Sequence, residues 1–208
     1  VLNWAKKHDL FVIADEVYRR IWFDEAPTSA LEFEEHRDRV VVVDSLSKTY
    51  SACGLRLGFL ISRNAELMEK VERLGQARLG PQPLAQAVGV AALQLDDGYY
   101  EEIRAVYRAR VEALVDGLAT IPGVSAHRPS GAFYCMVDLP VKDADRFARF
   151  LVTEFRDGGE SLVVAPGGGF YADPENGRTQ IRLAAVEGPD EIARSCKILR
   201  AALEAYVD

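Results

Sequence analysis

Residues 40–60 read VVVVDSLSKTYSACGLRLGFL, and this stretch decides how the first part of the chain folds. It opens with four consecutive valines, Val40–Val43, a short apolar run that ends in an aspartate. Such a run is typical of a strand buried on both faces of a parallel sheet. Leu10–Ala14, which also precedes an aspartate, and Leu57–Ile61 are similar runs. The sequence therefore predicts three strands in this part of the chain.

Helical signals alternate with these strands. Asn64 is a suitable N-cap for a helix with apolar residues at helical spacing, and Pro83 suits the first turn of the next helix. Strands that alternate with helices predict an α/β layered domain.

The character of the chain changes after Asp96-Asp97-Gly98. One long helix follows and ends at Ile121-Pro122-Gly123. The remaining pattern predicts a strand at 132–139, a helix at 144–155, short strands at 162–165 and 180–184, and a closing helix with Ile192, Cys196, Leu199, Leu203 and Tyr206 on one face. We therefore predict two domains, an α/β domain of residues 1–97 and a small α+β domain of residues 98–208 that includes the long helix.

Composition narrows the class of function. The 208 residues are 49% hydrophobic and 27% charged, as in a globular protein with an ample core. A net charge of −7 argues against nucleic acid or an anionic membrane as the main partner. No apolar stretch approaches the roughly 20 residues that span a bilayer. Cys53, Cys135 and Cys196 form neither a CxxC pair nor a metal-like cluster, so we expect reduced thiols, no metal site and a cytoplasmic location.

The first residues do not resemble the start of a protein. They include no initiator methionine, no signal peptide and no helix cap, and Val1, Trp4 and Ala5 are spaced as in the middle of an amphipathic helix. We expect the chain to begin inside an element and to be a fragment of a longer protein.

Two candidate site residues follow the first predicted strand. Asp15 lies at its carboxyl end, where open α/β sheets bind their ligands. Tyr18, three residues on, reaches the same side if a turn of helix follows. The alternative is that Asp15 only caps the next helix, and for an isolated aspartate after a strand this alternative is the commoner one.

A second group follows the strand of valines. Ser45 and Ser47 are hydroxyl residues at a strand-to-loop turn and suit a phosphate, and Lys48 at this position can be partly desolvated. Arg56, between two glycines, adds a bidentate phosphate donor. The alternatives are an ordinary polar loop with a solvated lysine, and a surface arginine.

Arg182 interrupts the apolar strand Ile181–Ala185. An arginine in such a strand needs a partner, for which a substrate carboxylate and a structural salt bridge are equally good candidates. Gly131-Ala132-Phe133-Tyr134 is consistent with a strand that enters a site, and equally with plain core.

One lysine, one carboxylate and a phosphate-binding cluster are what pyridoxal phosphate (PLP) requires of a protein. In their order and spacing these residues resemble the class I/II aminotransferases of the fold-type I PLP enzymes. The matching segments are FVIADEVYRRIWFD (11–24), VVVVDSLSKTYSACGLRLGFL (40–60), SGAFYCMVDLP (130–140) and QIRLAAV (180–186). The resemblance spans the whole chain but only the C-terminal half of such an enzyme, and SLSKTYSACGLRLG is its most specific part.

The resemblance implies a partial PLP-dependent transferase fold and a role for each candidate. Lys48 corresponds to the Schiff-base lysine, Asp15 to the partner of the pyridine nitrogen, and Tyr18 to the hydroxyl beside the cofactor's phenolic oxygen. Phosphate ligands are implied at Ser45, Ser47 and Arg56, and an α-carboxylate clamp is implied at Arg182. The implied enzyme is a homodimer that transfers an amino group from an L-amino acid to a 2-oxo acid, with 2-oxoglutarate expected as the acceptor.

Several alternatives stay open. The family's Asn-Pro-rich segment, its phosphate loop and its ring-stacking aromatic do not occur in these residues, so we expect the 208-residue piece to be inactive alone. A C–S lyase or a decarboxylase of the same fold, or a non-catalytic remnant, is also compatible with the sequence. Arg78 is either a plain exposed arginine or a residue that enters the partner subunit's site and favours dicarboxylates.

Overall fold

A computed structural model describes residues 1–207, which form two compact units. The first contains Val1–Arg104 and the second begins at Ala105, so the division falls within one long helix. The sequence places the domain boundary at residue 97, where that helix begins, and this placement stays a prediction. Each unit is described by itself.

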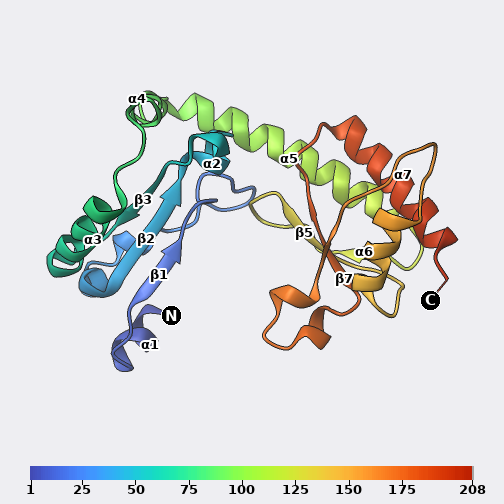
Figure 1. The fold of residues 1–208 in the computed structure, drawn as a ribbon, viewed down its shortest axis with the longest axis horizontal. Coiled ribbons are helices and arrows are strands. Elements are labelled where there is room, and N and C mark those ends of the chain that lie inside the picture. The colour runs from blue at the N-terminus through green and yellow to red at the C-terminus, as the bar shows by residue number, and fades with distance from the viewer. Residues whose placement is uncertain (208) are drawn as a thin grey trace. The chain divides into compact units, whose positions relative to one another are not determined.

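The first unit contains a three-stranded sheet with helices that follow it in the chain (Figure 1). The elements of this unit are α1 (Leu2–Lys7), β1 (Val12–Asp15), the 3-10 helices Ala30–Glu32 and Glu34–Arg39, β2 (Val40–Ser45), α2 (Leu46–Thr49), the 3-10 helix Cys53–Leu55, β3 (Gly58–Ile61), α3 (Ala65–Arg78), α4 (Pro83–Ala92) and the start of α5 (Asp97–Ala119).

The predicted helix starts of this unit are confirmed. The Asn64 side chain accepts a hydrogen bond from the Leu67 amide at 2.9 Å and caps α3. Pro83 is the first residue of α4. Both signals act within one helical turn, which is why the sequence alone reveals them.

The sheet has the order β1-β2-β3, and only part of the predicted arrangement is correct. β1 and β2 are parallel, whereas β2 and β3 are antiparallel because the segment between them stays at the carboxyl end of β2. Val40–Val42 of β2 are buried as predicted. The prediction that β1 is buried on both faces is wrong, since Ile13 is 72% exposed. Within the described residues β1 pairs with β2 alone, so it forms one edge of the sheet.

The second unit is the predicted small α+β fold. The remainder of α5 is followed by β4 (Ser125–Ala126), β5 (Tyr134–Asp138), α6 (Ala144–Thr153), β6 (Ala165–Pro166), the 3-10 helices Gly168–Phe170 and Pro174–Gly177, β7 (Gln180–Ala184) and α7 (Pro189–Ala205). The strands form an antiparallel sheet of order β4-β5-β7-β6. The strand predicted at 162–165 is shorter and later, since only Ala165–Pro166 pairs with β7.

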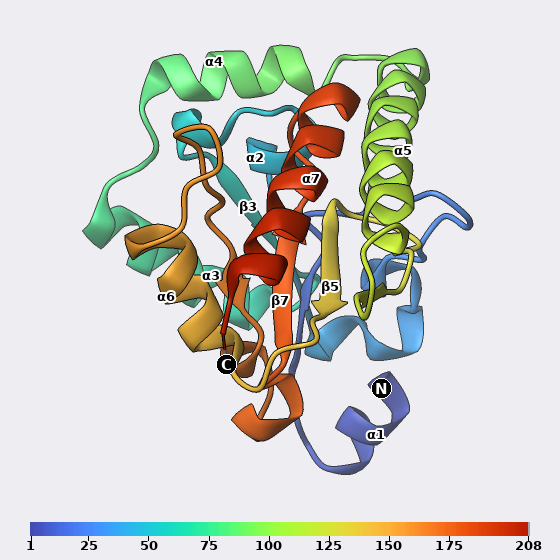
Figure 2. The same cartoon turned by 90° about the vertical axis from the view of Figure 1, so that its right-hand side faces the viewer.

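One face of this sheet packs on helices. Figure 2 shows α7 running alongside β7 and β5. The core consists of apolar side chains from the sheet and from three helices, namely Val111, Leu114, Leu118, Val137, Phe147, Leu151, Ile181, Leu199 and Ala202. Within residues 1–207, no helix combines the length and the apolar composition that crossing a membrane requires.

Candidate active site

The carboxyl ends of β1 and β2 bring the first group of candidate residues to one edge of the sheet. In the parallel register Asp15 lies opposite Val43, and the Glu16 amide donates to the Val43 carbonyl at 2.9 Å. Ser45, at the end of β2, therefore lies beside the residues that follow β1. This is the edge at which open sheets with parallel strands bind ligands.

Asp15 and Glu16 have different roles at this edge. Glu16 accepts hydrogen bonds from the Ser29 hydroxyl at 3.0 Å and from the Ala30 amide at 2.7 Å, so it holds the 29–30 segment in place. Asp15 is exposed, and one of its oxygens accepts from the Val17 amide at 3.2 Å. No helix begins directly after Asp15, so this hydrogen bond closes a turn and is not the helix cap of the alternative explanation. A carboxylate bonded in this way keeps accepting capacity for a ligand.

Lys48 and Tyr18 lie close together. The turn after β1, with a hydrogen bond from the Arg19 amide to the Glu16 carbonyl, directs Tyr18 toward α2. The Lys48 Nζ atom lies 5.9 Å from the centre of the Tyr18 ring. Lys48 is half-buried, so it is not the fully solvated lysine of the alternative explanation.

The two serines lie at the start of the short helix that carries Lys48. Ser45 is its N-cap, and the Ser45 hydroxyl accepts from the Ser47 amide at 3.2 Å. An N-cap hydroxyl retains its own O–H donor, which a phosphate oxygen can accept.

The segment with Arg56 returns to the carboxyl end of β2 because β3 is antiparallel to β2. Ser45 pairs with Gly58, and the Leu46 amide donates to the Leu57 carbonyl at 3.2 Å. Arg56 is exposed, has a left-handed backbone (φ 51°), and donates from one guanidinium nitrogen to the Cys53 carbonyl at 2.8 Å. The strands approach so closely that a Cβ at Gly58 would lie 2.9 Å from the Asp44 carbonyl oxygen.

Asp44 is a residue of this edge that the sequence did not single out. Burial raises the pKa of its carboxyl group, and the hydrogen bond from the Ser45 amide opposes this rise. The position directly after four valines is the only signal that could have identified it.

Three tyrosines anchor the far end of α2. The Tyr99 hydroxyl donates to the Thr49 carbonyl at 3.0 Å, and its ring stacks on Tyr50 with 5.6 Å between ring centres. The hydroxyl groups of Tyr50 and Tyr100 are 2.7 Å apart. The backbone that carries Lys48 is therefore fixed at both ends, by Ser45 and by these tyrosines.

Arg182 belongs to the second unit, in β7, where it lies opposite Met136 of β5. Its Cζ atom lies 4.2 Å from the ring centre of Tyr134 and 4.3 Å from that of Phe170. No ion pair of Arg182 occurs among the described residues, and its guanidinium lies against these two rings. The sequence did not predict Phe170 as a neighbour of Arg182, because the only local pattern there is the glycine run that precedes it.

Arg78, Cys135 and Cys196 lie outside the two groups of candidate residues. Arg78 is exposed at the last position of α3; its role in a partner's site stays a prediction. Cys135 and Cys196 are buried, and burial raises the pKa of the Cys135 thiol to about 11 and that of the Cys196 thiol in the same direction. Thiols of this kind are structural and unreactive.

The residues of the first unit fit PLP by their donor chemistry. Hydroxyl groups and a guanidinium suit its phosphate, a carboxylate suits its pyridine nitrogen, and a phenol beside a primary amine suits its oxygen and its aldehyde. The structure brings together Asp15, Tyr18, Ser45, Ser47, Lys48 and Arg56, all within residues 15–56.

Comparisons with known proteins agree with this chemistry. The putative aminotransferase AatC of Rhizobium meliloti (strain 1021) is 31% identical over 206 residues, which cover 96% of this chain and 48% of that protein. An aspartate aminotransferase of Musicola paradisiaca (strain Ech703) is 33% identical over 172 residues, which cover 80% of this chain and 41% of that protein. The chain thus spans about half the length of the curated relatives it matches.

A solved structure of similar fold carries a derivative of the cofactor. LysN, an alpha-aminoadipate aminotransferase from Thermus thermophilus, was crystallised in complex with N-(5'-phosphopyridoxyl)-L-leucine. It matches with a TM-score of 0.81 and 27% identity over 98% of this chain and 52% of that chain. The family model for aminotransferases of class I and II matches residues 1–196. The chain therefore belongs to the class I and II aminotransferases, a family of PLP-dependent enzymes of fold type I.

Proposed function

We propose that the whole protein transfers an amino group from an L-amino acid to a 2-oxo acid, with 2-oxoglutarate as the acceptor, and acts as a homodimer. The observation that carries this proposal is the position of Lys48. Its ammonium group lies over the ring of Tyr18, on a backbone fixed at both ends, at the carboxyl edge of β1 and β2. Family membership supports the reaction type, the 2-oxo acid and the dimer.

The residues at this edge have separable roles toward the cofactor. Ser45, Ser47 and Arg56 bind its phosphate with hydroxyl groups and a guanidinium. Asp15 would hold the pyridine nitrogen with its carboxylate and favour the protonated form of that nitrogen. Tyr18 donates its hydroxyl to the phenolic oxygen.

Lys48 is the catalytic residue of the proposal. PLP, when bound, supplies an electron sink that stabilises negative charge at the substrate's Cα. Lys48 would hold the cofactor through its side-chain amine, and the same amine, when free, would take the proton from the substrate's Cα. Arg182 binds the substrate's α-carboxylate and thereby orients the Cα–H bond.

Reductive labelling tests the proposal directly. The chain is incubated with PLP, reduced with borohydride, digested and mapped by mass spectrometry. We expect the pyridoxyl group on Lys48, and not on Lys70, an exposed lysine that forms an ion pair with Glu66 at 2.5 Å. Arg56→Ala should weaken the labelling of Lys48 and leave Lys70 unchanged.

Labelling spread equally over exposed lysines, or labelling of Lys48 that Arg56→Ala leaves unchanged, would refute the assigned site. Product analysis on the complete gene product tests the reaction itself. A transaminase consumes one 2-oxo acid for each one formed, and release of ammonia without an acceptor would refute amino transfer.

A further inference from the structure

The guanidinium group of Arg182 is held by aromatic rings and not by a carboxylate. Its Cζ atom lies 4.2 Å from the ring centre of Tyr134 and 4.3 Å from that of Phe170. Both distances are within the range of a cation–π interaction. A ring face attracts the cation without neutralising its charge, so Arg182 keeps a full positive charge for a ligand.

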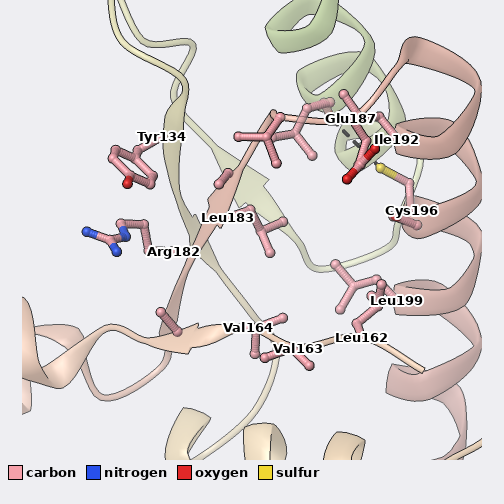
Figure 3. A pocket seen from close by; sticks show the side chains of 15 residues that line it. Tyr134, Leu162, Val163, Val164, Arg182, Leu183, Glu187, Ile192, Cys196 and Leu199 are labelled. Carbon is pink, nitrogen blue, oxygen red and sulfur yellow. Dashed lines mark hydrogen bonds between the residues drawn. The ribbon is translucent and has the colours of Figure 1, made fainter. Parts of the chain in front are cut away.

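The sheet register explains how Tyr134 reaches Arg182. Arg182 pairs directly with Met136 in the antiparallel register of β5 and β7, and Tyr134 is two residues from Met136 on the same face. Figure 3 shows Tyr134 and Arg182 together on one side of the strands, with Leu183 and Leu199 on the other. A cavity of about 400 Å³ lies beside these strands, and its mostly apolar lining includes Leu183 and Leu199 together with Tyr134 and Arg182.

Phe170 reaches Arg182 through a tightly packed loop. A Cβ at Gly167 would lie 2.7 Å from the Gln180 Cβ and 2.8 Å from the Gly177 carbonyl oxygen, so only glycine permits this contact with β7. The Gly167 amide also donates to the Gln180 carbonyl at 2.7 Å. The glycine run that precedes Phe170 thus fixes the loop against the strand of Arg182.

A chain of side-chain hydrogen bonds closes the same loop. The Tyr171 hydroxyl donates to the Gln180 Oε1 atom at 2.6 Å, and the Gln180 Nε2 atom donates to the Asp138 Oδ1 atom at 2.8 Å. Gln180 is two residues before Arg182 and lies on the same face of β7. Both neighbours of Arg182 are therefore attached to the sheet that carries it.

We propose that Tyr134 and Phe170 are positioning residues that hold the Arg182 guanidinium in place for a carboxylate ligand. The rings restrict the rotation of the guanidinium, whereas its N–H donors stay available for a bidentate bond to two carboxylate oxygens. Pre-organising the guanidinium reduces the entropy lost on binding. The proposal rests on the proposed function only for the identity of the ligand, the α-carboxylate of the substrate.

Nuclear magnetic resonance of the 208-residue chain, with acetate as the carboxylate probe, tests this inference. In the parent chain we expect the Arg182 Nε–H proton to be shifted upfield by the ring currents and to move on titration with acetate. Phe170→Leu and Tyr134→Leu should each reduce the ring-current shift and weaken acetate binding about twofold to fivefold, the factor that ~0.5–1 kcal/mol for one exposed cation–π interaction corresponds to.

Tyr134→Phe is the matched control, because it keeps the ring and removes only the hydroxyl group. We expect it to retain both the shift and the affinity of the parent chain. Acetate binding that is unchanged in both leucine variants would overturn the proposal, as would a loss in Tyr134→Phe equal to that in Tyr134→Leu. Phe170 is 48% exposed, so Phe170→Leu remains informative even if Tyr134→Leu fails to fold.

Failure of this inference and failure of the proposed function can be told apart. Acetate binding at Arg182 requires neither the cofactor nor Lys48, and the labelling of Lys48 requires neither Tyr134 nor Phe170. Normal labelling in Phe170→Leu together with unchanged acetate affinity would refute the positioning role alone.

Discussion

Replacing Gly58 by alanine should destabilise the edge of the sheet that carries the candidate site. The added Cβ would lie 2.9 Å from the Asp44 carbonyl oxygen and 3.4 Å from the Ser45 Cβ. The first neighbour is backbone, which cannot rotate away as the end of a side chain can. We therefore expect β3 to shift away from β2 and to weaken the adjacent hydrogen bond from the Leu46 amide to the Leu57 carbonyl, now 3.2 Å long.

The expected change in the free energy of unfolding of Gly58→Ala follows from two opposing effects. Overpacking of this kind costs about 1–3 kcal/mol. Replacing a glycine by alanine also restricts the unfolded chain, which stabilises the fold by about 0.4–1 kcal/mol where the backbone tolerates the change. Gly54→Ala is the matched control, because a Cβ at Gly54 meets nothing within 4 Å. The control shares the chain-entropy effect, so the difference between the two variants isolates the close contact at ~1–3 kcal/mol.

Urea unfolding followed by tryptophan fluorescence measures this difference. The two tryptophans of the chain, Trp4 and Trp22, both lie in the first unit, so their emission reports on that unit. We also expect Gly58→Ala, and not Gly54→Ala, to reduce PLP labelling of Lys48, because Arg56 lies only two residues before the displaced strand. Equal unfolding midpoints for the two alanine variants would refute the reasoning.

Three further predictions concern other parts of the chain. Burial and the Tyr100 hydroxyl raise the pKa of Tyr50 above its ordinary value of 10.0. The free energy of unfolding should therefore be highest below pH 10 and should fall as the pH rises further. Tyr50→Phe should lessen this fall, which urea unfolding at alkaline pH measures. In Gly117→Ala the new Cβ would lie 2.6 Å from the Cys196 sulfur, so we expect a destabilisation of ~1–2 kcal/mol in thermal melts. Adding Cys196→Ala should remove most of this loss, and purely additive effects of the two substitutions on stability would contradict the contact. The buried His36 Nδ1 atom has no hydrogen-bond partner among the described residues. His36→Leu should therefore raise the free energy of unfolding by ~1 kcal/mol in urea. A clear loss of stability in this variant would show that the imidazole is hydrogen-bonded in solution.

The helices of this chain could be predicted because their signals are local. Asn64 caps α3 and Pro83 begins α4 through contacts within one turn, and β7 occupies Gln180–Ala184 as its apolar pattern predicts. Strand direction could not be predicted in the same way. β3 is antiparallel because of the path that the chain takes after β2, and the residues of β3 themselves do not indicate that path.

The candidate site likewise contains residues that the sequence could predict and features that it could not. Asp15, Ser45, Lys48 and Arg56 were recognisable because each follows or precedes a strand at a position typical of a ligand site, and the resemblance of residues 40–60 to a known family assigned them chemistry. The turn formed by Asp15 and the buried carboxyl group of Asp44 were not recognisable, because hydrogen bonding and desolvation depend on atoms that come together only when the chain folds.

By itself, the sequence of this protein determined its family, its cofactor chemistry and the lysine expected to bind that cofactor, because residue type and spacing along the chain carry that information. Only the tertiary structure decided the surroundings of Arg182. Its partners in space are 48 and 12 residues away, at Tyr134 and Phe170, and which side chains meet there depends on the register of β5 with β7 and on the packing of Gly167 against β7. An arginine in an apolar strand requires a partner, and the fold supplied two aromatic rings in place of a carboxylate.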